Sequence, residues 1–170
     1  MRHKAYYKSP IGMLCIEEEE GFIVGLHFVK ETIGKGVTTE DTVYGEKGGI
    51  DTAEGKILRQ AVRQLEEYFS GKRTEFELPV AYSGTDFQVR VWEGLRTIPY
   101  GETRSYSEIA VQIGNPKAAR AVGNANNKNR ILILVPCHRV IGANGALVGF
   151  GAGLDVKKYL LELERKKEAH

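Results

Sequence analysis

The stretch SYSEIAVQIGNPKAARAVG, residues 105–123, says most about how the second half of the chain folds. Ser105 is followed three residues later by Glu108, a capping box that opens a helix expected over 106–113. Gly114 closes this helix, because helices commonly end on a glycine in the left-handed conformation. The stretch therefore begins with a short helix whose two ends are both marked.

A second helix is expected to follow at once, with Asn115 as its cap and Pro116 at its first position. Two short helices joined by a tight glycine-containing turn predict a helix-turn-helix, whose second helix commonly enters a DNA groove. The same pattern also fits a helical corner that binds no nucleic acid. Arg120 is the one long cation among side chains small enough to let another backbone come close: Ala118, Ala119, Ala121, Gly123 and Ala125.

The flanking segments complete a mostly helical half. A helix is predicted from Asp86 to about Thr97, and Pro99-Tyr100-Gly101 breaks it. The apolar run 131–135 is short and rich in β-branched residues, which favours a buried strand. A final helix is predicted over about 155–167. Its core-facing residues are expected to be Val156, Tyr159, Leu160 and Leu163.

The first half is predicted to mix strands with one helix. Alternation over 5–28 indicates a β-hairpin or meander. One side of it is expected to carry Phe22, Val24, Leu26 and Phe28. Residues 29–50 form a glycine- and threonine-rich connection, and a capping box at Asp51 opens a helix that ends at Gly71. Residues 76–82 predict a strand that returns to the sheet.

These elements predict an α/β (α+β) chain of two domains, 1–84 and 85–170, which differ in charge. The first carries a net charge of −3 and the second +5. From 104 to 139 there are six basic residues and one acid, as expected where a polyanion docks. A solvated basic face without any partner remains the commoner explanation of such an imbalance.

The composition, 42% hydrophobic and 27% charged over 170 residues, is that of a globular protein with a core. No apolar run approaches the ~20 residues that a bilayer span needs, so we expect no membrane partner. The first residues do not lead into the apolar stretch of a secretory signal, which predicts a cytoplasmic protein. In that reducing compartment, Cys15 and Cys137 are expected to be one packing residue and one nucleophile.

Chemistry is concentrated in Pro136-Cys137-His138-Arg139-Val140. A thiol becomes a good nucleophile when a base or a cation stabilises its thiolate, and here His138 and Arg139 follow Cys137 directly. Neighbouring residues of an extended chain point to opposite faces, so the pair can cooperate only through a backbone turn or a bridging water. A buried cysteine beside a hydrogen-bonded histidine, without catalysis, remains the alternative. Glu164 on the last helix is able to reach a histidine.

Two glycine-bearing loops follow the cysteine. Residues 142–145 are expected to form a turn, and the loop 149–153 would allow close backbone approach around the ring of Phe150. Such a loop is suited to clasping a flat ring, although a flexible linker has the same composition.

Several motifs together resemble the O6-alkylguanine-DNA alkyltransferases, also called methylated-DNA–protein-cysteine methyltransferases. They are IPYGET at 98–103, NPKAARAVG at 115–123, PCHRV at 136–140 and LLELE at 160–164. The resemblance runs from Thr85 to Glu164 in one order; the first half is similar only loosely, through Ser9-Pro10-Ile11-Gly12. It implies a ribonuclease-H-like αβ domain followed by a winged-helix-like domain with a DNA-binding helix-turn-helix.

The activity implied by this resemblance is direct reversal of DNA damage. An O6-alkylguanine, and by extension O4-alkylthymine, would be flipped out of double-stranded DNA before its alkyl group moves to Cys137. His138 would deprotonate the thiol through a water, Glu164 would orient the imidazole, and Asn129 would tie the cysteine loop to the recognition helix. The thioether product has no facile route of hydrolysis or exchange, so each molecule should act once, as a monomer and without a cofactor.

The resemblance also implies which residues contact the substrate. Arg120 would take the place of the flipped nucleotide, and Tyr106 would rotate the 3′ phosphate and donate a hydrogen bond to guanine N3. The carbonyls of Cys137 and Val140 would read the guanine amine. The other expected DNA contacts are Arg104, Lys117, Ala119, Ala121 and Gly123. The rest of the pocket would be lined by Pro136, Gly149, Phe150 and Gly151.

The sequence departs from the family pattern at several positions. Phe150 stands where many members have tyrosine, Gly151 offers less side chain against a bulky adduct, and Arg130 replaces a common proline. The zinc site of some animal members is not recognisable, so we predict no metal. Cys15, His3 and His27 are the available ligands there, and Cys15 is expected to pack in the core.

Two other classes of protein would use some of the same residues. A cysteine hydrolase or thiol oxidoreductase would share Cys137 and His138, but it would turn over and would need a resolving cysteine or an oxyanion hole, neither of which is recognisable. A non-catalytic DNA-damage sensor would share the helix-turn-helix, but the sensor-like relatives lack the reactive cysteine.

Overall fold

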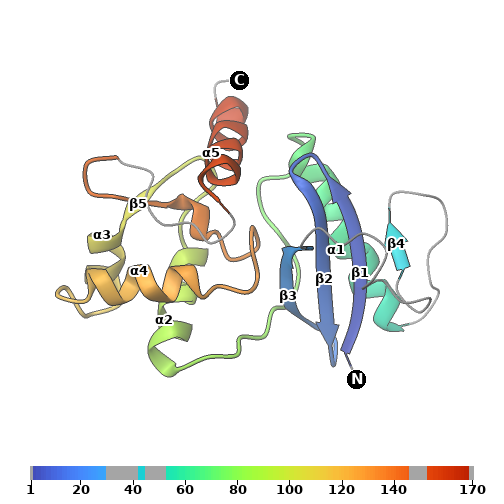
Figure 1. Ribbon diagram of the computed structural model, residues 1–170, viewed down its shortest axis with the longest axis horizontal. Coiled ribbons are helices and arrows are strands. Elements are labelled where there is room, and N and C mark those ends of the chain that lie inside the picture. The colour runs from blue at the N-terminus through green and yellow to red at the C-terminus, as the bar shows by residue number, and fades with distance from the viewer. Residues whose placement is uncertain (1, 30–41, 45–52, 146–152, 169–170) are drawn as a thin grey trace. The chain divides into compact units, whose positions relative to one another are not determined.

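The computed structural model describes residues 2–29, 42–44, 53–145 and 153–168. The chain divides into two compact units, residues 1–81 and 82–170 (Figure 1). Within the described ranges, no helix has both the length and the apolar character needed to cross a bilayer.

The first unit is built on a four-stranded sheet of order β3-β2-β1-β4. Its strands are β1 (Arg2–Ser9), β2 (Gly12–Glu19), β3 (Phe22–Phe28) and β4 (Thr42–Tyr44). The first three form the antiparallel meander that the alternation predicts, and β4 runs parallel to β1. Because β4 lies within 29–50, which was expected to be a connection only, its pairing is a correction to the sequence analysis.

A β-bulge changes which side of β3 faces the core. Glu17 pairs with Gly25 and Glu18 pairs with Ile23, so Val24 is an extra residue in the ladder. Beyond this point the alternation shifts by one, and Ile23 is buried while Phe22 is 45% exposed. The expectation that Phe22 lies on one side of the segment with Leu26 and Phe28 is therefore wrong.

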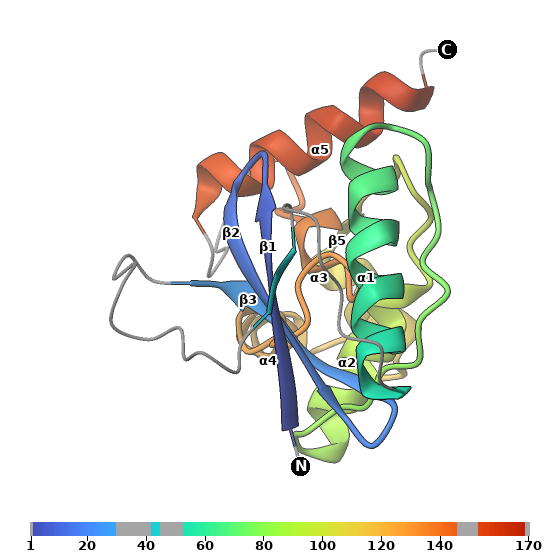
Figure 2. The ribbon, with the colours of Figure 1, turned by 90° about the vertical axis from the view of Figure 1, so that its right-hand side faces the viewer.

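Helix α1 (Ala53–Phe69) packs along one face of the sheet (Figure 2). It ends as predicted at Gly71, whose φ of 76° suits glycine. Its expected cap, Asp51, lies outside the described residues. The strand predicted over 76–82 is wrong, because only Val80 bridges to the sheet, beside Ile23.

The second unit is a cluster of helices around two short strands (Figure 1). Its elements are α2 (Asp86–Arg96), β5 (Arg104–Ser105), α3 (Tyr106–Gln112), α4 (Ala119–Asn127), the 3₁₀ turn η1 (Cys137–Arg139), β6 (Val140–Ile141) and α5 (Leu154–Glu168). The capping box of Ser105 and Glu108 is present, and Thr85 and Gln88 form another one ahead of α2. Helices α2, α3 and α5 thus confirm the predicted ones within a residue or two.

Helix α4 starts later than the sequence indicates. The Ala118 amide donates to the Asn115 carbonyl, which closes a turn over 115–118, and the first helical bond runs from Val122 to Ala118. Asn115 and Pro116 therefore shape the turn and do not cap the helix. The N-cap is Ala118, which has no side chain able to make a capping hydrogen bond.

The apolar run 131–135 is buried as expected, but it is folded into turns and is not a strand. The Asn129 side chain replaces a neighbouring strand as partner: it accepts from the Ile131 amide and donates to the Val135 carbonyl at 2.8 Å. Ile133 has a φ of 70°, which a strand would not allow. The apolar composition of 131–135 correctly predicted that this segment is buried. Its backbone conformation depends on the hydrogen bonds of Asn129.

Trp92 joins α2 to α4 inside the second unit. Its indole Nε1 donates to the Ala125 carbonyl at 2.9 Å, and its ring stacks on Tyr82. Because the indole is buried, this hydrogen bond fixes where α4 lies on α2.

We expect Trp92→Phe to lower the free energy of unfolding by about 1–3 kcal/mol, because the Ala125 carbonyl loses the indole donor, keeping the Lys128 amide at 3.1 Å, and the smaller ring leaves a cavity. Denaturant unfolding followed by circular dichroism measures this. Tyr159→Phe, at a 38% exposed position, is the control and should change stability by less than about 0.5 kcal/mol. Equal effects of the two substitutions would contradict the assigned role of Trp92.

Candidate active site

The backbone turns sharply at the cysteine, so Cys137 and His138 do not lie on an extended chain. Both belong to η1, and both side chains are buried. The following strand β6 pairs with β5, setting Arg104 beside Val140 and Ser105 beside Ile141. This pairing brings the start of α3 next to the cysteine turn.

A buried charged cluster holds His138. Its Nε2 lies 2.7 Å from Glu164 Oε2, and Arg139 Nε donates to Glu164 Oε1 at 2.8 Å. Arg139 also donates to the Ile98 carbonyl, and its guanidinium lies over the ring of Tyr100. The predicted contact between Glu164 and His138 is therefore made, with Arg139 as a further partner that the sequence analysis did not assign.

The ionisation of this cluster fixes the histidine tautomer. The pKa of Glu164 is held well below its usual range, against burial, by the charge and hydrogen bonds of His138 and Arg139. Burial lowers the pKa of His138. A carboxylate only accepts hydrogen bonds, so Nε2 of a neutral His138 carries the hydrogen and Nδ1 has the lone pair. Nδ1 is buried and has no hydrogen-bond partner among the described residues.

Cys137 is a protonated thiol at neutral pH, because burial raises its pKa to about 11. A hydrogen bond from the Asn129 side chain and the charge of Lys157 oppose this rise. A thiol in this state needs a base to remove its proton before it can act as a nucleophile.

Lys157 is a functional candidate that the sequence analysis missed. Its side chain is fully buried, and Nζ donates to the Val140 carbonyl at 2.5 Å. Burial lowers its pKa, while the nearby Cys137 raises it. The sequence analysis expected Tyr159 to face the core, but Tyr159 is exposed and Lys157 is the buried residue. Its spacing of seven residues from Glu164 was the available signal, since it puts both side chains on one face of α5.

Helix α4 is connected to the cysteine turn by a side chain that the sequence analysis did not single out. Asn126 is buried and its Nδ2 donates to the Cys137 carbonyl at 3.3 Å, while its Oδ1 has no partner within the described part of the chain. Asn129 was predicted to make this connection. Asn129, just past the end of α4, also makes it, through hydrogen bonds to Ile131, Val135 and the side chain of Cys137.

Tyr106 stands between the cysteine turn and α4. It is the first residue of α3, and burial together with the neighbouring Cys137 raises its pKa. The Tyr106 ring faces Gly123 of α4, where a Cβ would lie 3.7 Å from the ring, an ordinary contact distance. Tyr106 and Cys137, expected to act on the same base, therefore lie close together, and Gly123, expected as a DNA contact, lies beside the tyrosine ring.

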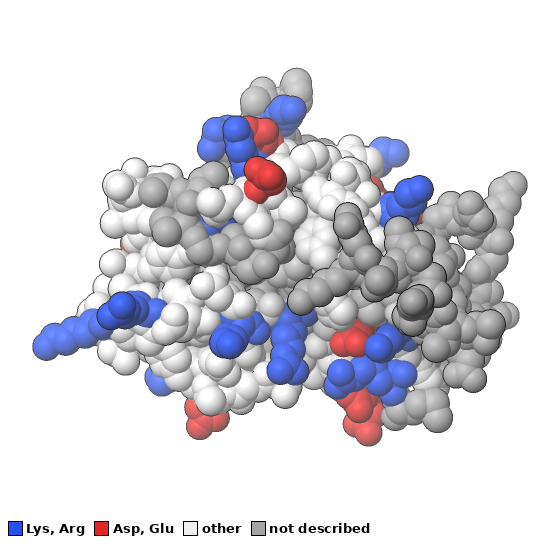
Figure 3. All heavy atoms as spheres, in the orientation of Figure 1, with Lys and Arg blue, Asp and Glu red and all other residues white. Residues whose placement is uncertain are grey.

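The expected DNA-contacting residues lie on α4 and the turn before it, with Arg104 on β5 and Tyr106 at the start of α3. Lys117, Arg120 and Ala121 are exposed, and Arg104 and Ala119 are half-buried. Figure 3 shows Lys and Arg side chains along the band that α4 occupies in Figure 1. Pro136 and Val140 flank η1 and are buried. Three expected pocket residues lie outside the described residues: Gly149, Phe150 and Gly151.

Known protein families match both units. A family described as 6-O-methylguanine DNA methyltransferase, DNA binding domain, matches residues 86–166, and its ribonuclease-like domain matches residues 2–82. These two matches confirm the predicted fold class.

Individual relatives cover nearly the whole chain. A methylated-DNA–protein-cysteine methyltransferase of Methanosarcina barkeri is 62% identical over 92% of this chain and 93% of its own length. One from Methanosarcina acetivorans is 48% identical over 94% and 96%. The crystal structure of a Mycobacterium tuberculosis protein, OGT in complex with DNA, is 47% identical, with a TM-score of 0.81 over 97% of this chain and 94% of that one.

We expect Lys157→Met to shift the reactivity of Cys137 toward higher pH, because the thiolate loses a nearby positive charge. A loss of about 1.4 kcal/mol would slow alkylation tenfold at a given pH. The measurement is the pH dependence of iodoacetamide labelling, followed on the peptide that holds Cys137. Lys158→Met, at the exposed neighbouring position, is the matched control. If both variants label like the parent, Lys157 does not stabilise the thiolate.

Proposed function

The chain belongs to the 6-O-methylguanine DNA methyltransferase family, and from that membership we propose that it repairs O6-alkylguanine in DNA by moving the alkyl group to Cys137. The observation that carries the proposal is the buried thiol of Cys137, next to a neutral His138 whose tautomer Glu164 fixes. That arrangement supplies a nucleophile together with the base that it needs.

The proposed step is a single displacement. Sulfur of Cys137 bonds to the alkyl carbon while the bond from that carbon to O6 breaks, and the electron pair returns to the guanine ring. The thiol proton passes through a water to Nδ1 of His138. The guanine anion takes a proton from solvent water and His138 later returns its proton to solvent, so the base and the histidine are both restored. The resulting positive charge on His138 is stabilised by the Glu164 carboxylate at 2.7 Å.

DNA is the partner of this family's second domain, and a DNA complex is known for the Mycobacterium tuberculosis relative. We propose that the exposed start of α4 enters the minor groove, where Arg120 fills the space left by the flipped base. Ala121 beside it is small and exposed, which supports a close approach of this helix. Action as a monomer in the cytoplasm belongs to the same proposal.

A duplex that contains O6-methylguanine should add about one methylene of mass to the protein, saturating at one per chain and located on Cys137. Intact-protein mass spectrometry with peptide mapping measures this. Cys137→Ala should abolish the transfer while leaving binding of the damaged duplex nearly intact, because the thiol is not part of the α4 surface.

Three other outcomes would point elsewhere. Binding of the damaged duplex without any adduct would indicate a sensor. Repeated turnover without an adduct would indicate a hydrolase. Loss of DNA binding in Cys137→Ala would mean that the thiol supports the structure.

Arg120→Ala should slow repair of the duplex roughly 10- to 100-fold and barely change attack on free O6-benzylguanine, which needs no flipping. Rates on both substrates, measured under single-turnover conditions, test this. Lys128→Ala removes an exposed positive charge just past the other end of α4 and is the matched control, with a smaller effect on the duplex. Equal losses on the duplex and on the free base would exclude the proposed role of Arg120.

A further inference from the structure

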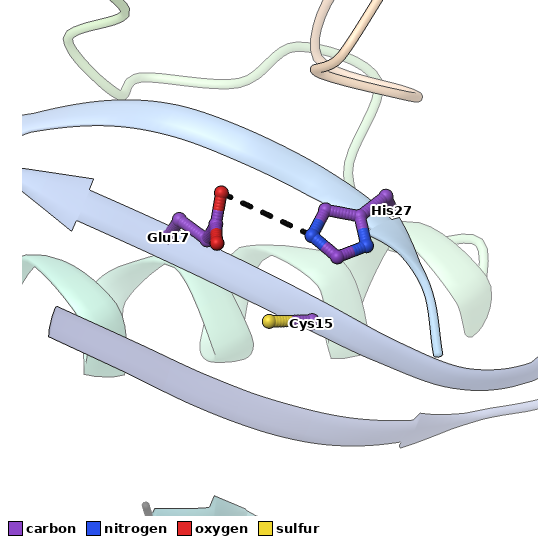
Figure 4. A group of neighbouring side chains, drawn as sticks. All are labelled: Cys15, Glu17 and His27. Carbon is purple, nitrogen blue, oxygen red and sulfur yellow. Dashed lines mark ion pairs between the residues drawn. The ribbon is translucent and has the colours of Figure 1, made fainter. Parts of the chain in front are cut away.

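Three possible metal ligands meet on the sheet of the first unit, far along the sequence from the cysteine turn. Cys15 and Glu17 project from the same face of β2, and His27 is paired with Cys15 across the ladder to β3 (Figure 4). One ligand atom from each, Sγ, a carboxylate oxygen and an imidazole nitrogen, lie within 4.8 Å of one another. The sequence alone does not show that Cys15 and His27 are neighbours, because it does not give the register in which β2 pairs with β3.

A glycine makes room for the carboxylate of Glu17. A Cβ on Gly25, its cross-strand partner, would lie 2.5 Å from Glu17 Oε2. The carboxylate therefore lies over the glycine, and its Oε2 comes to 3.9 Å from His27 Nε2. Any other residue at position 25 would displace this oxygen.

The orientation of His27 points its lone pair at that oxygen. Nδ1 lies 3.3 Å from the Phe28 carbonyl, and because a carbonyl only accepts, Nδ1 carries the hydrogen. In the neutral ring Nε2 is then an acceptor that faces the carboxylate. Metal-binding histidines are commonly held this way, with one nitrogen on a backbone carbonyl and the other on the ion.

Two positively charged side chains, Arg2 and Lys4, also contact the Glu17 carboxylate and would have to move when it binds a metal ion. Lys4 lies 3.5 Å from Oε1, the oxygen that faces away from the histidine contact. Arg2 lies 3.6 Å from Oε2 but is closer to Glu19, at 3.2 Å. Both side chains are about half exposed, so they can turn toward water when Oε2 takes another partner.

We propose that Cys15, Glu17 and His27 bind a divalent ion of the zinc class. One thiolate, one imidazole and one carboxylate suit Zn²⁺, which takes three protein ligands and a water in open tetrahedral sites. Bonds of about 2.0–2.3 Å put the ligand atoms of such a site roughly 3.3–3.7 Å apart. The 3.9 Å separation of Oε2 and Nε2 needs only a small side-chain adjustment to reach that range.

The test measures binding of Co²⁺ and Zn²⁺ to the full chain in a Cys137→Ser background, which leaves Cys15 as the only thiol. Co²⁺ should produce the near-ultraviolet absorption of a thiolate–cobalt bond at one ion per chain, and Zn²⁺ should displace it. His27→Gln alters a half-exposed side chain that folding does not require, and it should weaken binding at least about tenfold. Cys15→Ser should remove the absorption.

The matched control is His3→Gln. His3 lies on β1 and faces Glu18, which is on the other side of β2 from Glu17, so its loss should leave metal binding unchanged. Lys4→Gln should tighten binding, since it removes a cation that competes for Glu17.

Absence of the cobalt–thiolate band, or an affinity equal in the parent and in His27→Gln, would overturn the proposal. In that case the 3.9 Å contact between His27 and Glu17 reflects only the pairing of β2 with β3. Alkyl transfer in a chain with Cys137 intact should be the same in parent and His27→Gln, so failure of the metal proposal is independent of the proposed function.

Discussion

The buried carboxylate of Glu164 is the constraint around which the second unit is organised. Burying a charge is costly unless it is paired and hydrogen-bonded, and Glu164 meets this condition by binding both His138 and Arg139. The guanidinium in turn is anchored on the Ile98 carbonyl, just before the break that separates α2 from β5. Helix α5, the cysteine turn and the end of α2 are thereby fixed to one another, and the tautomer of His138 follows from the same contacts.

The cysteine turn is held from two sides before any substrate arrives. Asn126 of α4 donates to the Cys137 carbonyl, and Lys157 of α5 donates to the Val140 carbonyl. Both carbonyls are those expected to read the guanine amine, so buried donors fix the acceptors in place. Such preorganisation is useful in a reaction that happens once per molecule, because it keeps the reacting groups in position without cost at the moment of attack.

The elements that the sequence predicted well are those whose signals are local. The capping box of Ser105, the glycine after α3 and the antiparallel meander depend on residues close together in the chain. The errors arise where a distant partner or an added residue changes the outcome. The bulge at Val24 reverses which side of β3 is buried, and the Asn129 side chain folds 131–135 into turns that the apolar composition cannot distinguish from a strand.

The same distinction applies to the candidate site. Cys137, His138 and Glu164 were found through motifs, but Lys157 looked like one of several lysines on an amphipathic helix. A lysine is normally exposed, and only the Val140 carbonyl and the neighbouring thiol explain why this one is fully buried. The grouping of Cys15, Glu17 and His27 likewise depends on strand register, which hydrophobic alternation leaves undetermined. Residues that act through long-range pairing therefore become recognisable only when the fold supplies their partners.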